Sequence, residues 1–253
     1  MSIADKLVTI AENEQKVFDA GYIEGFKAVY GDILGTSRFP DKFWELYQEG
    51  GERTDYSGAF KNWSWYQFTP KYSLTNISNG YECFRNFNNA GANGGRPYRA
   101  ASDISSTKIK VSGNADNMFF SAVIDHLGEV DFSKVTSFNR AFYASEIRKI
   151  DKLIWSDTYQ SPHTPEMHSG NIFDYASTLE NITIEGKITE RFISFAWSTN
   201  LTYGSLYSII RALADVSNQP YGFSYQLVLG SANIAKLTDH DLEWASNKGW
   251  EVL

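Results

Sequence analysis

A short pattern that is written three times between Asn117 and Leu201 constrains the fold of this chain more than any other feature. NMFFSAVI, NRAFYASEI and NIFDYASTL each contain an Asn, a Phe a few residues later, a small residue and then Ile or Leu, and FAWSTNL repeats the second half. A unit of about 22 residues that recurs with insertions is typical of a stacked solenoid, in which each unit covers the apolar face of its neighbour. The anchoring phenylalanines, separated by 22, 31 and 22 residues, are Phe120, Phe142, Phe173 and Phe195.

Each unit is expected to hold one turn and one short strand. Ile147 and Ile150 follow the second pattern at steps of three, and the third pattern leads into the alternating run LENITIEGKI, which is typical of a strand. We therefore predict an α/β fold with an irregular leucine-rich-repeat-like solenoid, in which Phe120, Phe142 and Phe173 stack in successive core layers. A β-sandwich with a coincidental Phe spacing is the alternative. The residues expected to form the adjacent strands are Ile147, Ile150, Leu179, Ile182 and Ile184.

The first residues predict a helix that associates with other chains. Ser2 and Asp5 fit a capping box, and Gly21 is a natural end. A short isolated helix is marginal in water, so this one must dock on a partner. A homo-oligomer, with a trimer favoured, and insertion into another protein are the expected partnerships; packing on its own domain is the alternative. The narrow apolar seam comprises Ile3, Leu7, Ile10, Glu14 and Val17.

Four segments follow from this interpretation. Residues 1–21 form the oligomerising helix, 22–100 an aromatic-rich connector and N-terminal cap, 101–201 the repeat array, and 202–253 a C-terminal α/β cap. STKIKV, Ser106–Val111, is predicted to be the first strand of the array. In the cap, a helix is expected behind Thr202, a strand at QLVLG, a second helix opened by Thr238 with Asp241 as its capping partner, and a final strand at WEVL.

Two irregular segments are the candidate recognition surface. The insert at 155–170 interrupts the repeat and carries rings and charges, and loops on a rigid scaffold often bind ligands. Its two prolines stiffen it but forbid the helical spacing of a histidine metal site, so no metal or other cofactor is expected. The alternatives are a solvated loop for the insert and a buried cap for the aromatic segment. The candidate binding residues are Trp155, Tyr159, His163, His168, Trp63, Trp65 and Tyr66, with Glu166 beside the histidines.

DFSKVTSFNRAFYASEI, Asp131–Ile147, and FDYASTLENITIEGKI resemble the BspA-like type of leucine-rich repeat. The opening MSIADKLVTIAENEQKVFDAGY, the segment Phe43–Phe60 and the closing LGSANIAKLTDHDLEWASNKGWEVL resemble proteins encoded in bacteriophage and prophage structural gene clusters of gut Firmicutes. These motifs are architectural and name no ligand. The resemblance implies a place, the virion or the cell surface, more than an activity.

The sequence contains no recognisable catalytic or nucleotide-binding motif. GxSxG, HExxH, GxxxxGK[ST] and GxGxxG are all absent, and Cys83, the only cysteine, is expected to be a small buried hydrophobe. A net charge of −7 argues against a nucleic-acid partner. No apolar run is long enough for membrane insertion, and no signal peptide is recognisable.

The expected function is therefore that of a non-enzymatic virion protein, assembled in the host cytoplasm, of the fibre, decoration or receptor-binding type. Its partners would be other virion proteins and a glycan or protein of the host surface. A virion-associated glycan depolymerase and a bacterial surface adhesin are the alternatives, because paired acids cannot be recognised without their separation in space.

Overall fold

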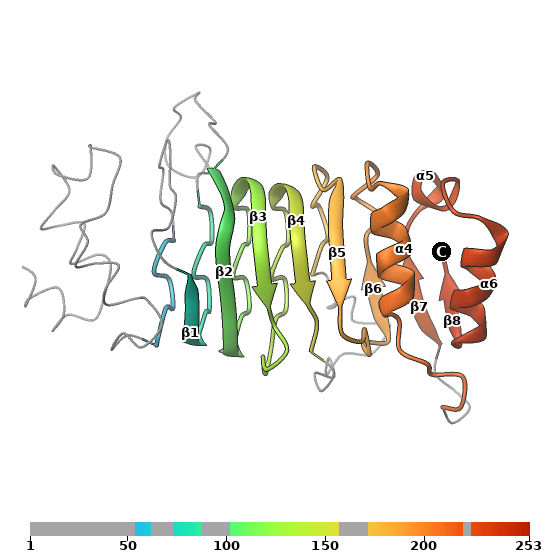
Figure 1. Ribbon diagram of the computed structural model, residues 1–253, viewed down its shortest axis with the longest axis horizontal. Coiled ribbons are helices and arrows are strands. Elements are labelled where there is room, and N and C mark those ends of the chain that lie inside the picture. Colours follow the sequence, from blue (N-terminus) through green and yellow to red (C-terminus); the bar gives the residue numbers. More distant parts are fainter. Residues whose placement is uncertain (1–53, 62–72, 88–101, 157–171, 220–223) are drawn as a thin grey trace, which may run out of the picture.

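The computed structural model describes residues 54–61, 73–87, 102–156, 172–219 and 224–253 of the 253-residue chain. They form a mixed α/β structure with two parallel sheets and few helices, extended along one axis (Figure 1). Along the chain the elements are β1 (Leu74–Asn79), β2 (Ser102–Asn114), β3 (Val123–Asp131), β4 (Glu146–Ile154), β5 (Asn181–Glu185), β6 (Phe192–Ser194), α4 (Tyr203–Ala212), β7 (Tyr225–Val228), α5 (Ser231–Ile234), α6 (Asp239–Asn247) and β8 (Trp250–Val252).

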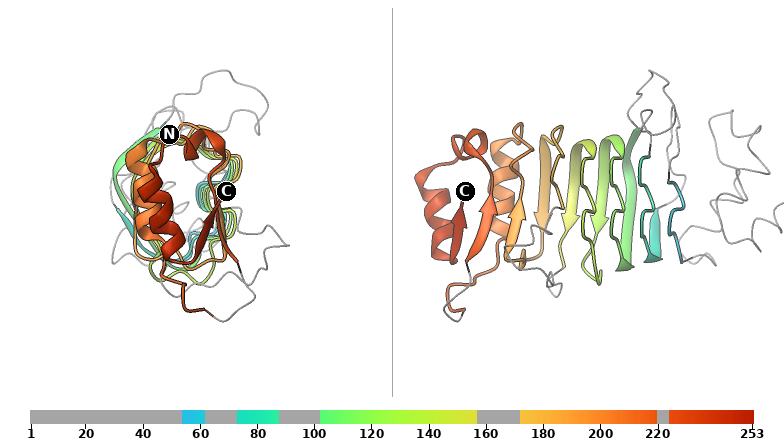
Figure 2. Two further views of the ribbon diagram at one scale, coloured as in Figure 1. Left: turned by 90° about the vertical axis from the view of Figure 1, so that its right-hand side faces the viewer. Right: turned by 180° about the vertical axis from the view of Figure 1, so that it is seen from behind.

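The larger sheet pairs its strands in the order in which they occur in the sequence, β1-β2-β3-β4-β5, and every pair is parallel. Between consecutive parallel strands the chain must return to the starting edge, and it does so through turns on the side opposite the sheet. Seen end-on, successive strands and turns superimpose around a common axis (Figure 2). We refer to the two surfaces as the sheet face and the turn face.

The turns are joined by their own ladder of backbone hydrogen bonds. Phe84 N–H donates to the Met118 carbonyl at 2.7 Å, and Phe119 N–H donates to the Ala141 carbonyl at 2.7 Å. Two residues before each of these phenylalanines the backbone is left-handed, with φ of 54° at Glu82 and 55° at Asn117. The left-handed residue reverses the chain, so the next turn repeats the same path one layer on. Backbone polar groups are thus paired on both faces of the stack.

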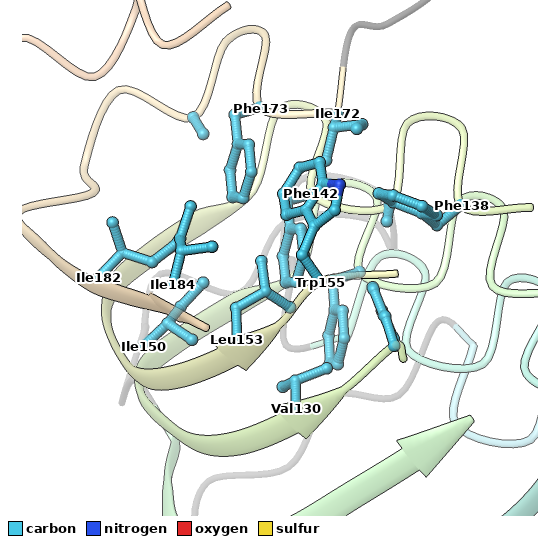
Figure 3. Close-up of a cluster of buried hydrophobic side chains, with 14 of the residues drawn as sticks. Val130, Phe138, Phe142, Ile150, Leu153, Trp155, Ile172, Phe173, Ile182 and Ile184 are labelled. Atoms are coloured by element: carbon cyan, nitrogen blue, oxygen red, sulfur yellow. The ribbon is translucent and has the colours of Figure 1, made fainter. Parts of the chain in front are cut away.

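A ladder of six phenylalanine rings fills the interior between the sheet and the turns. Neighbouring ring centroids lie 4.6 to 5.1 Å apart, and all six side chains are buried. Ile150 and Leu153 of β4 and Ile184 of β5 come from the sheet to the same core (Figure 3). This inner phenylalanine ladder comprises Phe60, Phe84, Phe119, Phe142, Phe173 and Phe195.

The predicted layers at Phe142 and Phe173 are confirmed, whereas the prediction for Phe120 is wrong. Phe119, two residues after the left-handed Asn117, occupies the core position, and Phe120 is only half-buried. The spacing of the pattern alone could not show which of these two adjacent phenylalanines points into the core.

The strand predictions are partly confirmed. Ile147, Ile150, Ile182 and Ile184 lie in β4 and β5 as expected, and Leu179 is buried just before β5 begins. STKIKV lies within β2, which is not the first strand, since β1 precedes it in the sheet.

Buried side chains of β4 recur at every third residue, as Ile147, Ile150 and Leu153. Two of every three residues therefore face outward, which gives the sheet face a high density of charged side chains. A step of three resembles helical periodicity, yet β4 pairs residue for residue with β3 from Val123↔Glu146 to Asp131↔Ile154.

In the C-terminal part, strands take over the turn face and a helix takes over the sheet face. The short sheet β6-β7-β8 continues the turn face, and α4 continues the sheet face beside β5 (Figures 1 and 2). Two hydroxyls of α4 meet β5: Ser205 Oγ accepts from Ile182 N–H at 2.9 Å, and Ser208 Oγ accepts from Ile184 N–H at 2.8 Å. The predicted helices and strands of this cap are confirmed, including Thr202 as the N-cap of α4 and the capping box of α6.

The predicted helix at 2–20 lies outside the described residues, as does most of the predicted connector at 22–100. Oligomerisation through Ile3 to Val17 stays a prediction. The described part of that connector contributes β1 and two rungs of the inner phenylalanine ladder, Phe60 and Phe84. It also holds Cys83, which is buried as expected.

Candidate binding surface

On the sheet face, charged side chains pair with one another across neighbouring strands. Arg148 donates to Asp125 at 2.7 Å, and this hydrogen bond is the main reason that the pKa of Asp125 lies below its ordinary value. Lys152 lies between Glu129 at 3.7 Å and Glu185 at 3.2 Å. Each Lys and Arg of β2 and β4 has a carboxylate oxygen within 3.9 Å; they are Lys108, Lys110, Arg148, Lys149 and Lys152. The charges of this face are therefore largely cancelled within the protein.

The turn face instead carries a second row of aromatic rings, outside the inner phenylalanine ladder. Phe120 stacks on Tyr143 with centroids 5.1 Å apart, Tyr143 meets the edge of Tyr175 at 5.2 Å, and Tyr175 stacks on Trp197 at 4.3 Å. We call these four residues the outer aromatic row. It runs along the stack, one ring for each layer, because every ring follows a ladder phenylalanine by one or two residues.

The exposure of the row increases toward the C-terminal end. Phe120 and Tyr143 are half-buried, whereas Tyr175 is 47% exposed and Trp197 is 48% exposed. Partial burial, together with Tyr175, raises the pKa of the Tyr143 phenol. Most ring faces in the row are covered by the next ring, so the row presents ring edges and polar tips. Trp197 has one stacking partner among the described residues and thus one ring face without an aromatic neighbour.

Two arginines flank the row. The Arg85 guanidinium lies 4.9 Å from the centroid of Phe120, and that of Arg140 lies 5.6 Å from the centroid of Tyr143. Arg85 is also held by the buried carboxylate of Glu82, which accepts a second ion pair from Lys61 at 2.6 Å. These ion pairs keep the pKa of Glu82 below its ordinary value, although burial opposes them. Arginine and aromatic rings together are enriched in protein recognition surfaces.

The predicted recognition residues fall into two groups. Trp155 is 1% exposed, so its assignment to a recognition surface is corrected: it packs edge-on against Phe138, and its indole N–H donates to Glu190 at 2.9 and 3.0 Å. Nothing in the sequence pairs Trp155 with a residue 35 positions later. The remaining predicted residues, Tyr159, His163, His168, Trp63, Trp65 and Tyr66, lie outside the described parts of the chain.

Sequence reasoning missed the outer aromatic row, although a signal for it was present. In FF, FY, FDY and FAW, an aromatic residue follows the ladder phenylalanine by one or two positions. Because the ladder residue points inward, a neighbour on the same turn must lie on the outside. The signal can therefore be used only once the inward residue is known. For Phe119 and Phe120, the prediction placed Phe120 in the core instead of Phe119.

Glu190 is a buried acid, and no Lys, Arg or His among the described residues forms an ion pair with it. Burial raises its pKa to about 8, against the opposing effect of hydrogen bonds from Trp155 and from backbone N–H groups. The unfolded chain would release this proton at a much lower pH, so ionisation of Glu190 favours unfolding as the pH rises. The contribution of Glu190 to stability is fully present below about pH 4.5 and is lost as the pH rises through 8.

Replacing Glu190 with Gln should therefore change how stability depends on pH. We expect the wild-type melting temperature to fall between pH 6 and pH 9, and the Glu190→Gln variant to lose less over that range, because it has no proton to release. The difference amounts to roughly 3 kcal/mol at most, because the contribution of Glu190 falls by about 1.4 kcal/mol per pH unit between pH 6 and its pKa of about 8. Thermal unfolding at pH 6, 7.5 and 9 measures it; parallel curves for the two proteins would mean that Glu190 does not retain its proton.

The described residues contain neither a metal-binding group nor a membrane-spanning helix. No group of three or more His, Cys, Asp and Glu side chains in those ranges could hold a metal ion. Among the same residues, no helix has the length and apolar character needed to cross a membrane. Comparison of the chain with protein-family models, with curated proteins and with solved structures found no match.

Proposed function

We propose that this protein is a binding protein built on a leucine-rich-repeat-like solenoid, and that its outer aromatic row binds a polymer on the surface of a host cell. The observation that carries the proposal is the half-exposed pair Tyr175 and Trp197, stacked at 4.3 Å at the end of an aromatic row that runs along the stack. Exposed rings that form a continuous row, rather than scattered single residues, indicate an interaction site.

The scaffold supports this proposal because it fixes the rings before any ligand arrives. Each ring is attached to a turn whose backbone is hydrogen-bonded to the next turn, as in Ser121 N–H to the Tyr143 carbonyl at 2.9 Å. A ligand therefore orders few side chains when it binds, which lowers the entropic cost of association. The regular interval between rings suits a ligand that is itself extended and repetitive.

The proposed location is the virion of a bacteriophage, where the protein would act as a structural or receptor-binding component. This part rests on the resemblance of the chain ends to phage structural proteins and of the repeats to BspA-like proteins. A bacterial cell-surface adhesin would use the same row in the same way. We propose that binding involves no chemical change of the ligand.

Removing the two exposed rings tests the proposal. On an array of bacterial surface polysaccharides, the wild-type protein should bind a subset. The Tyr175→Ser, Trp197→Ser double variant should bind that subset at least about tenfold more weakly, because two central aromatic contacts are lost. Its circular dichroism spectrum should stay unchanged, because both side chains are half-exposed.

A matched control removes two exposed rings from the other side of the molecule. Tyr203 and Tyr207 lie on α4 and are 47% and 39% exposed. The Tyr203→Ser, Tyr207→Ser double variant should bind like the wild type. Equal losses in both double variants, or no loss in either, would refute the assignment to the row. Release of reducing ends from a bound polysaccharide would instead support the alternative of a depolymerase.

A further inference from the structure

Arg140 is an exposed cation in an unfavourable backbone conformation. Its φ is 53°, in the left-handed region that Gly and Asn adopt most readily. The equivalent positions in the preceding layers, two residues before the ladder phenylalanine, are held by Gly58, Glu82 and Asn117. Gly58 and Asn117 are residue types that the conformation favours, whereas Glu82 and Arg140 are not.

The structure gives a stabilising reason for the charged residue at Glu82 but none for Arg140. Glu82 is buried and holds both Lys61 and Arg85. Arg140 is exposed, and its one described contact is with the ring of Tyr143. Among the residues that the structure describes, no carboxylate forms an ion pair with Arg140. Ser121, Ala144 and Tyr175 are left-handed as well, so the conformation alone does not set Arg140 apart. What points to a role in function is an exposed charge that has no ion-pair partner among the described residues.

The cations of the sheet face, by contrast, are paired. There every Lys and Arg of β2 and β4 has a carboxylate within 3.9 Å. In a chain with a net charge of −7, carboxylates are not scarce. Arg140, which has no carboxylate partner among the described residues, lies directly beside the outer aromatic row, where an anionic ligand could provide the negative charge.

Resting on the function proposed above, we propose that the ligand of the outer aromatic row is an acidic polysaccharide, with an anionic group bound by Arg140 and a sugar ring packed on the half-exposed Trp197, against the ring face that has no aromatic neighbour among the described residues. Tyr143 lies under the Arg140 guanidinium and Tyr175 lies between Tyr143 and Trp197, so the polymer would run along the row. A guanidinium supplies several N–H donors in a plane, which suits carboxylate, sulfate or phosphate.

Other anionic polymers fit the surface less well. Nucleic acids need a cluster of cations along the backbone, and they bind through ring faces, most of which are covered within the row. An extended acidic peptide advances about 3.3 Å per residue, whereas neighbouring rings lie 4.3 to 5.2 Å apart. A linked sugar ring is closer in length to that interval.

The test uses the full chain and two pairs of probes. Polygalacturonate and its fully methyl-esterified form share one backbone and differ in charge, and dextran sulfate and dextran differ in the same way; polyglutamate supplies charge without sugar rings. We expect the wild type to bind the two acidic polysaccharides roughly tenfold more tightly than their neutral forms, with the difference shrinking as salt is added. Equal binding to charged and neutral forms, equal binding to polyglutamate, or no binding to either acidic polysaccharide would overturn the proposal.

Arg140→Asn is the decisive variant, because it places at this turn the residue that Asn117 provides one layer earlier. We expect its melting temperature to be equal to or higher than that of the wild type, and its affinity for polygalacturonate to fall roughly tenfold. Loss of binding could then not be attributed to misfolding. The matched control is Lys108→Asn, which removes one exposed cation from the sheet face and should leave binding unchanged.

The same measurements separate this proposal from the function on which it rests. If the Tyr175→Ser, Trp197→Ser variant loses binding while Arg140→Asn does not, the row is a binding site, but Arg140 does not bind an anionic group of its ligand and the present proposal fails alone. If neither variant loses binding, the row is not the binding site and both proposals fail.

Discussion

Replacing Phe142 with Ala is expected to lower the free energy of unfolding by about 3 to 5 kcal/mol, as large aromatic truncations in protein cores do. Phe142 is fully buried between two parallel rings, with the Phe119 centroid at 5.1 Å and the Phe173 centroid at 5.0 Å. Figure 3 shows Phe142 beside Phe173. Its removal leaves a cavity that neither neighbour can fill, because each is fixed by the hydrogen bonds of its own turn. Urea denaturation followed by tryptophan fluorescence measures the loss.

Phe120 supplies the comparison for Phe142. It is half-buried in the outer aromatic row, so the Phe120→Ala variant should lose clearly less stability than Phe142→Ala. Phe119→Ala should resemble Phe142→Ala. If Phe120→Ala were the more damaging of the two substitutions in the Phe119 and Phe120 pair, the inward and outward assignments made here would be reversed.

Replacing Gly128 with Ala is expected to destabilise the protein by about 3 kcal/mol or more, at the upper end of what overpacking costs. A methyl group at this position would lie 2.3 Å from the Ser105 carbonyl oxygen and 2.6 Å from that of Thr107. Both are backbone atoms of β2, which bulges beside Gly128: the register shifts between Ile104 and Lys108. The bulge can move away only by breaking its pairing with β3.

Gly204 is the matched control for this substitution. It lies exposed in α4, and apart from its chain neighbours and the backbone of its own helix, no described atom lies within 4 Å of the position that a methyl group would occupy. Gly204→Ala should therefore be neutral or stabilise the protein by up to about 1 kcal/mol, because alanine favours the helix. A similar response of both glycines to alanine would show that the predicted clash at Gly128 is relieved without cost.

The repeat could be predicted because its signal is local. Phe142, Phe173 and Phe195 follow one another in the inner phenylalanine ladder, and Ile182 and Ile184 alternate as a strand should. The C-terminal cap was predictable for the same reason, since Thr238 and Asp241 form a capping box within four residues. In each case the residues that determine the structure lie close together in the sequence.

The remaining features depend on contacts between layers. The burial of Trp155 requires Glu190, and the need for glycine at position 128 comes from the bulge in the preceding strand. The outer aromatic row becomes visible only when four turns are placed one above another. The position of Arg140 in a left-handed conformation likewise has no signature in a single sequence, because that conformation is ordinarily inferred from Gly or Asn.

The two hydroxyls that α4 presents to β5 have a consequence for self-association. An unpaired strand edge is a template on which another chain can add a strand, and stacked parallel sheets would otherwise be prone to grow end to end. The hydroxyl oxygens of Ser205 and Ser208 accept hydrogen bonds from the N–H groups of Ile182 and Ile184, and the helix that carries them covers that edge. Polymerisation by strand addition is thereby blocked at β5, so copies of this protein that meet there must recognise one another through side chains or remain separate.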